Sequence, residues 1–182
     1  NMLVDWTNET SGELWTNTKE GMQLAGSVLP GNWVPHFQKE NIDLFDSLEM
    51  TGELEKAVKK VVWLSNGSYL LFEKTEAMHV IDVNTGKFIG KHSLNKTILE
   101  TNLLAAAELG RQIILRNLSG IIVIDFINMK SDKDRRQVQA VLEAALKEDP
   151  LRSVVIGFTE LGLMQITRKK EGPDLYEILL EE

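Results

Sequence analysis

Residues 120–129 read Gly-Ile-Ile-Val-Ile-Asp-Phe-Ile-Asn-Met, a run of branched aliphatic side chains with one carboxylate, Asp125, set into it. An apolar run this short, rich in Ile and Val and opened by glycine, predicts a β-strand buried on both faces rather than a helix. Burying an ionised Asp without a partner is costly. Asp125 therefore predicts that a cation, a cluster of donors or a helix N-terminus lies beside this strand.

A second hydrophobic stretch repeats this pattern around Asp82. Residues 77–87 read Ala-Met-His-Val-Ile-Asp-Val-Asn-Thr-Gly-Lys, so Asp82 lies at the end of an apolar run. Because side chains alternate along a strand, Val80, Asp82 and Asn84 share one predicted face, and His79 lies on the other. Two strands that each carry one aspartate predict a shared site.

A hairpin is predicted immediately before the Asp82 strand. Residues 61–74 read Val-Val-Trp-Leu-Ser-Asn-Gly-Ser-Tyr-Leu-Leu-Phe-Glu-Lys, two β-rich runs joined through Asn66 and Gly67. Asn-Gly favours a type I′ turn, because both central positions of that turn need positive φ. Three consecutive strands are therefore expected before the first long helix.

Helices and strands then alternate toward the end of the chain. Residues 97–116 have apolar positions at a period near 3.6, and a second helix, capped by Ser131 or Asp132, runs to about residue 148. Two closing strands are expected at 153–158 and 162–168. The order β-β-β-α-β-α-β-β predicts an α+β domain, a mixed β-sheet with two main helices packed on it.

The leading segment differs from the rest in charge and pattern. Residues 1–54 carry nine acids against two lysines, whereas residues 55–182 carry eighteen charges of each sign. A short helix is expected at 19–29 and another at 52–60, with Leu44 and Phe45 as a buried anchor. We interpret residues 1–54 as a remnant of a preceding domain or as an extension.

The composition excludes several kinds of site. The chain has no cysteine, so it holds neither a disulfide nor a thiolate zinc site. Hydrophobic residues make up 43% and charged residues 26%, which are ordinary values for a globular protein. Neither an apolar run near membrane-spanning length nor a basic and apolar leader is found, so we expect a soluble, cytoplasmic protein.

Several ordered motifs in this chain resemble the ribonuclease E/G family of bacterial endoribonucleases. The matching runs lie at 75–87, 101–107, 111–116, 120–129 and 161–169, and the resemblance covers roughly residues 40–176. It implies the family's deoxyribonuclease-I-like catalytic subdomain over 55–182. The segment 1–54 would be a remnant of the family's ribonuclease-H-like part.

The resemblance also implies a function and its residues. It predicts a Mg²⁺-dependent endoribonuclease that cleaves single-stranded RNA in RNA processing or decay, including rRNA processing. Asp82 and Asp125 would hold the metal, and Asn84 would orient Asp82. Arg152 and Arg168 would contact the RNA. A homo-oligomer of the full-length protein is left open.

Departures from the family pattern keep two alternatives open. Asn128 stands where the family usually has a second Asp, Ser119 replaces a family Gly, and the leader is acidic. A divergent, catalytically weak RNA-binding or assembly module is therefore the rival function. No S1-type RNA-binding module and no 5′-phosphate sensor are recognised in these residues. The structural alternative is that Asp82 caps a turn and Asp125 pairs locally.

Overall fold

The computed structural model describes residues 11–39, 42–86 and 94–180. The chain divides into two compact units, Asn1–Lys56 and Ala57–Glu182, and each is described here by itself. The predicted boundary lay between residues 54 and 55, two residues before the observed division. That the first unit derives from a ribonuclease-H-like part stays a prediction.

The first unit contains a two-stranded parallel sheet. Strands β1 (Gly12–Thr16) and β2 (Trp33–Phe37) are joined by helix α2 (Lys19–Val28), which confirms the helix expected at 19–29. Thr18 caps α2 by accepting the Gly21 N–H at 3.0 Å. The short helices α3 (Leu44–Ser47) and α4 (Thr51–Ala57) follow. The predicted anchor is wrong: Phe45 is 45% exposed, because a helix of four residues presents no continuous buried face.

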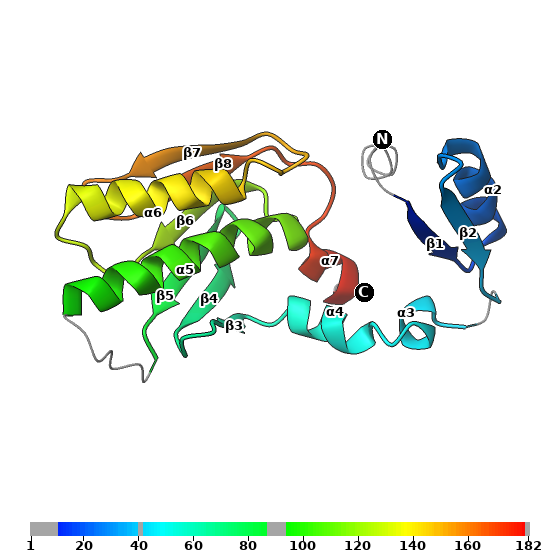
Figure 1. Ribbon diagram of the computed structural model, residues 1–182, viewed down its shortest axis with the longest axis horizontal. Helices are drawn as coiled ribbons and strands as arrows, with labels where there is room; N and C mark the ends of the chain where they lie inside the picture. The colour runs from blue at the N-terminus through cyan, green and yellow to red at the C-terminus, as the bar shows by residue number, and fades with distance from the viewer. Residues whose placement is uncertain (1–10, 40–41, 87–93, 181–182) are drawn as a thin grey trace. The chain divides into compact units, whose positions relative to one another are not determined.

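The second unit is built on one six-stranded mixed sheet (Figure 1). The strand order across the sheet is β3-β4-β5-β6-β8-β7, and only β5 and β6 pair in parallel within it. This sheet confirms the expected α+β class and the order of strands and helices. The strand bounds are β3 (Val61–Trp63), β4 (Tyr69–Lys74), β5 (Met78–Asn84), β6 (Gly120–Asp125), β7 (Ser153–Phe158) and β8 (Met164–Arg168).

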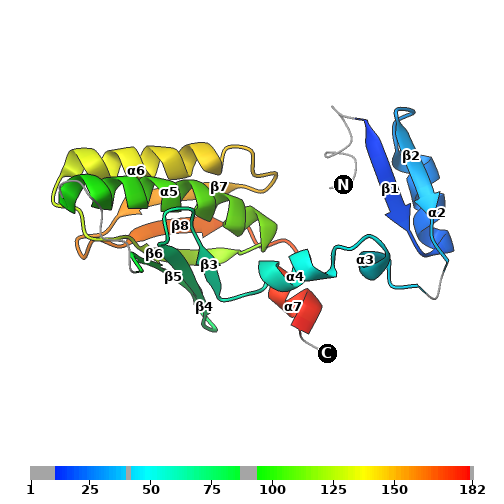
Figure 2. The ribbon, with the colours of Figure 1, turned by 60° about the horizontal axis from the view of Figure 1, so that its bottom comes forward.

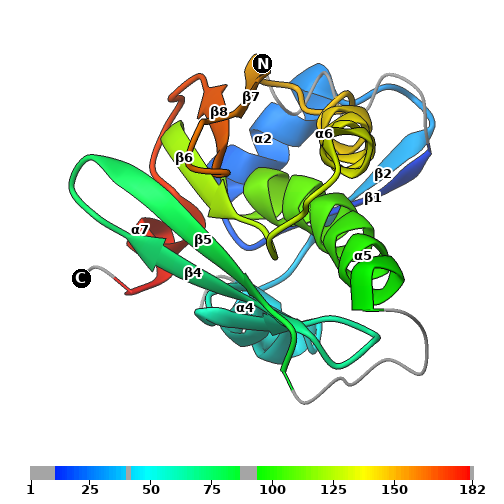
Figure 3. The same cartoon turned by 90° about the vertical axis from the view of Figure 1, so that its left-hand side faces the viewer.

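Two long helices cover one face of this sheet, as Figures 2 and 3 show. Helix α5 (Leu94–Leu115) connects β5 to β6, and α6 (Asp132–Ala145) connects β6 to β7. Of the two predicted caps of α6, Ser131 is the N-cap, and its hydroxyl accepts the Asp134 N–H. The two helices approach so closely that a Cβ built on Gly110 would lie 2.4 Å from the Cβ of Ala145.

The core lies between these helices and one face of the sheet. On β6, Ile122 and Ile124 are fully buried beneath the helices, whereas Ile121 on the other face is 47% exposed. The prediction that this strand is buried on both faces is therefore wrong. We call the face that α5 and α6 leave uncovered the open face. It carries Val80, Asp82 and Asn84, because β5 alternates as predicted.

The predicted hairpin forms with a different turn. The Gly67 N–H donates to the Leu64 carbonyl at 3.0 Å, and of the two predicted turn residues only Gly67 has positive φ, at 82°. Asn66 instead accepts the Ser68 N–H at 3.1 Å through its side chain. This arrangement matches a longer loop with one left-handed glycine rather than a type I′ turn.

A short helix that the sequence did not predict completes the unit. Helix α7 (Leu175–Leu180) follows β8 and is tied to β4 by Lys74, whose ammonium lies 2.8 Å from a carboxylate oxygen of Asp174. Among the described residues, none of the helices combines the length and apolar character that crossing a membrane requires.

Candidate functional site

The two predicted aspartates lie opposite each other on neighbouring strands. In the parallel pair of β5 and β6, Asp82 and Asp125 are register partners at the carboxyl ends of the strands. Register partners point to the same face, so both carboxylates lie on the open face. Neighbouring strands are about 4.8 Å apart, so one small ligand can contact both side chains. Asp82 is half-buried and Asp125 is exposed.

Asn84 is placed to orient the first of these carboxylates. It lies two residues after Asp82 on β5 and therefore on the same face. Its Nδ2 donates a hydrogen bond to Oδ2 of Asp82 at 2.6 Å. One carboxylate oxygen is thereby held by the amide, which restricts the rotation of the whole group.

A buried asparagine that the sequence reasoning did not single out fixes the chain beyond Asp125. Asn102 on α5 is fully buried; its Nδ2 donates to the Ile127 carbonyl at 2.7 Å, and its Oδ1 accepts the Ile127 N–H at 3.1 Å. These two bonds clamp the loop that follows β6. The signal in the sequence was a polar residue inside an apolar helical run, because a buried amide needs partners.

The two aspartates place two like charges side by side, and Asp125 is exposed, so the burial cost expected from the sequence does not apply to it. Within the described parts of the chain, neither Asp82 nor Asp125 takes part in an ion pair. Two carboxylates directly opposite each other on adjacent strands repel. The same described residues contain no group of three or more His, Cys, Asp or Glu side chains that could hold a metal ion. Mg²⁺ needs no such cluster, since one or two carboxylates suffice when waters and substrate supply the other oxygens.

Arg152 lies away from this pair. It precedes Ser153, which is the register partner of Arg168 on β8, and Arg168 in turn pairs with Gly120 at the start of β6. Asp125 ends the same strand, about 17 Å further along at about 3.3 Å per residue. Arg152 is exposed, and a contact between it and RNA stays a prediction.

The Arg168 side chain is buried and hydrogen-bonded within the protein. It is 4% exposed, its Nε and Nη2 donate to the Asp149 carboxylate at 2.7 and 2.9 Å, and its Nη1 donates to Asn117 and to the Leu118 carbonyl. Burial raises the pKa of Asp149, but hydrogen bonds from Arg168, Ser153 and a backbone N–H outweigh this effect and lower that pKa. No part of the guanidinium is offered to a phosphate, so we do not retain Arg168 as an RNA contact.

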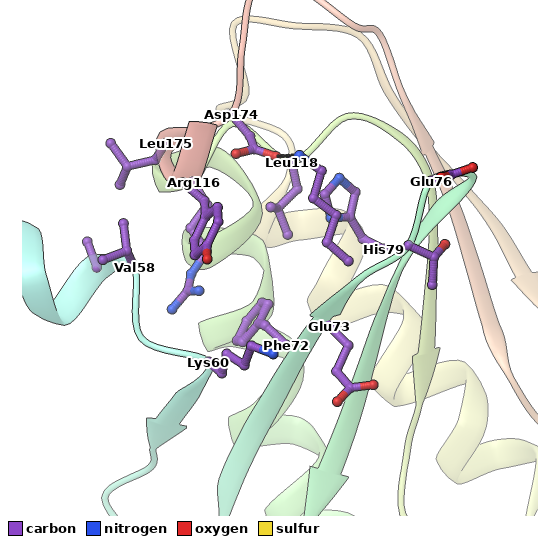
Figure 4. A pocket seen from close by; sticks show the side chains of 14 residues that line it. Val58, Lys60, Phe72, Glu73, Glu76, His79, Arg116, Leu118, Asp174 and Leu175 are labelled. Carbon is purple, nitrogen blue, oxygen red and sulfur yellow. Dashed lines mark ion pairs between the residues drawn. The ribbon is translucent and has the colours of Figure 1, made fainter. Parts of the chain in front are cut away.

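Figure 4 shows the residues that line a cavity of about 390 Å³. The cavity is lined by His79 near the start of β5, whereas Asp82 lies toward the other end of that strand. The Arg116 guanidinium lies 4.2 Å from the ring centre of Phe72 and donates to the Lys59 carbonyl at 2.8 Å. Burial lowers the pKa of Arg116 to about 10. Lys74 and Asp174 close another wall as an ion pair. These contacts join α7 to the ends of β4 and α5, so we read the cavity walls as structural.

Comparison with known proteins agrees with the family resemblance of the sequence motifs. The model of the Ribonuclease E/G family matches residues 1–171. Ribonuclease G of Escherichia coli (strain K12) is 42% identical over 139 residues, which are 76% of this chain and 28% of that protein. Ribonuclease E of Nostoc sp. (strain PCC 7120) is 37% identical over 154 residues, 85% of this chain and 22% of that protein. The chain thus spans less than a third of each of these relatives, and it belongs to the ribonuclease E/G family.

Proposed function

We propose that this chain is the catalytic part of a Mg²⁺-dependent endoribonuclease that cleaves single-stranded RNA in RNA processing or decay. The observation that carries the proposal is the register pairing of Asp82 with Asp125 on the open face, with Asn84 bonded to Asp82. Relatives named Ribonuclease G and Ribonuclease E support RNA as the substrate. Processing of rRNA, a cytoplasmic location and assembly into homo-oligomers belong to the same proposal.

Four residues of the chain would have a defined part in this mechanism. Asp82 and Asp125 would hold Mg²⁺, and their all-oxygen donor set fits that ion. A Mg²⁺ ion held there would supply Lewis-acid chemistry, polarisation of a phosphate and activation of a water. Asn84 keeps one oxygen of Asp82 in place, and Asn102 keeps the loop after Asp125 from shifting. Hydrolysis by water would leave a 3′ hydroxyl and a 5′ phosphate.

Cleavage of a short single-stranded RNA with a 5′ monophosphate tests the proposal. We expect the natural full-length protein to require Mg²⁺ and expect Asp82→Asn or Asp125→Asn to lower cleavage at least about a hundredfold, roughly 2.7 kcal/mol of transition-state stabilisation. Asp132→Asn is the matched control, because this carboxylate is 80% exposed and lies on α6 rather than on the sheet. Equal cleavage by all four proteins contradicts the assignment of the site.

One observation favours the rival function, a catalytically weak RNA-binding or assembly module. Asn128 lies beyond the end of β6 at Asp125, so strand alternation does not decide where it points, and its side chain is exposed. Three residues after Asp125, an amide thus stands where the family usually has a carboxylate. RNA binding by the full-length protein without Mg²⁺-dependent cleavage would support this rival.

A further inference from the structure

An aromatic pair, the exposed Trp63 and the half-buried Tyr69, lies on the same face as the two aspartates. Trp63 on β3 is the register partner of Tyr69 on β4, which is in turn the partner of Asn84 on β5. The Trp63 and Tyr69 rings have centroids 4.9 Å apart and are tilted by 52°. Because register partners share a face, both rings project from the open face in the row of Asn84.

Trp63 leaves more apolar surface in water than a packing role requires. Its side chain is 66% exposed, although fully burying a large apolar side chain is favourable. One edge of the ring lies beside Gly86, since a Cβ built on that glycine would lie 3.8 Å from Cζ3 of Trp63. An indole that keeps two thirds of its side chain exposed provides a flat apolar surface for stacking.

The pair lies within reach of a strand that passes over the aspartates. Tyr69 is the diagonal neighbour of Asp82, since Asp82 pairs with Leu71, and such neighbours are about 7–8 Å apart. Trp63 lies one strand spacing further, about 4.8 Å. A nucleotide that flanks a phosphate at Asp82 and Asp125 can therefore place its base on these rings.

We propose that Trp63 and Tyr69 form a stacking subsite for an unpaired base of single-stranded RNA, next to the phosphate that is cut. The subsite rests on the proposed function, because that function places the phosphate at the aspartates. Stacking uses the π-face that every base has, so this subsite tolerates any base rather than reading a sequence. In the terms of the reaction, Trp63 and Tyr69 are positioning residues.

Binding without cleavage tests the subsite. The natural full-length protein with Asp82→Asn is titrated with a single-stranded RNA series in which an abasic nucleotide is moved along the strand. We expect Trp63→Ala to weaken binding between about fivefold and about a hundredfold and Trp63→Phe to retain most of it. At one position in the RNA, the abasic nucleotide should weaken binding to the protein that keeps Trp63. At that same position it should not weaken binding to the Trp63→Ala variant any further.

A matched control and a separate readout make the outcomes distinct. Ile156→Ala removes another exposed apolar side chain, 59% exposed on β7, and should leave RNA affinity unchanged. Equal affinity of Trp63→Ala and the parent overturns the subsite, and so does a loss that is the same at every abasic position. If Trp63 passes this test but the protein with intact Asp82 never cuts RNA with Mg²⁺, base stacking on Trp63 stands, whereas the nuclease assignment and the place of the subsite beside a cut phosphate both fail.

Discussion

Asp149 and Arg168 form an ion pair whose two side chains are almost fully buried. Removing one partner of such a pair leaves an uncompensated charge in the interior, so we expect Arg168→Met to lower the free energy of unfolding by about 3–5 kcal/mol. Urea unfolding at neutral pH measures this change. Lys169→Ala is the control, since its pair with Glu171 is exposed and is worth about 0–1 kcal/mol.

The same pair predicts how stability depends on pH. The folded pKa of Asp149 lies below its ordinary value of 3.8, so its contribution to stability is present above that value and is lost as pH falls through the folded pKa. Stability of the parent should therefore fall below about pH 4. Asp149→Asn should be less stable at neutral pH and show a shallower acid dependence; parallel curves for the two proteins would contradict the assignment.

The facing carboxylates predict a metal effect that needs no substrate. Asp82 and Asp125 repel each other across β5 and β6, so a divalent cation should raise the melting temperature of the parent. Asp125→Asn removes the repulsion and one ligand together. We expect this variant to be at least as stable as the parent in EDTA and to gain little from Mg²⁺ in a thermal scan. An equal Mg²⁺ shift in both proteins would argue against a site at this pair.

At the scale of elements, the crossing of α5 and α6 depends on Gly110. Alanine in a helix interior is normally about 1 kcal/mol better than glycine, but here its Cβ would lie 2.4 Å from the Cβ of Ala145. Overpacking of this kind costs about 1–3 kcal/mol, so Gly110→Ala should destabilise the protein in denaturant unfolding. Adding Ala145→Gly should recover part of the loss. A more stable Gly110→Ala would show that the helices separate without penalty.

Periodicity predicted the strands and the two long helices of the second unit, because the apolar positions there match the strand and helix repeats, but it did not predict β1 or α7. The alternation around Asp82 fixed which side chains share a face, and two aspartates at strand ends indicated one site. The sequence pattern could not show that Ile121 faces away from α5 and α6, because an isoleucine can occupy a buried or an exposed strand position. Nor could it distinguish Arg168, whose partner Asp149 lies nineteen residues earlier, from a surface cation.

At the scale of the whole molecule, the second unit has a core of its own. Every residue of the main hydrophobic cluster lies between Leu64 and Ile166, inside the unit that begins at Ala57. We therefore expect a fragment of residues 57–182 to unfold in one cooperative transition and to keep the Mg²⁺ response of the parent. Circular dichroism during thermal unfolding measures both. A fragment without a cooperative transition would show that the core is not self-sufficient.

The parallel pairing of β5 with β6 also sets when the proposed site can appear. The hairpins β3–β4, β4–β5 and β7–β8 join neighbours in the sequence, whereas Asp82 and Asp125 meet only after a crossover that includes all of α5. Non-local pairings of this kind form late, because the entropy of closing the loop is lost before the stabilising contacts are made. Because Asp82 precedes Asp125 in the chain by the whole of α5, it leaves the ribosome well before its partner during synthesis. If the proposed function holds, the nascent chain cannot cleave its own mRNA through this pair of aspartates until β6 has paired with β5.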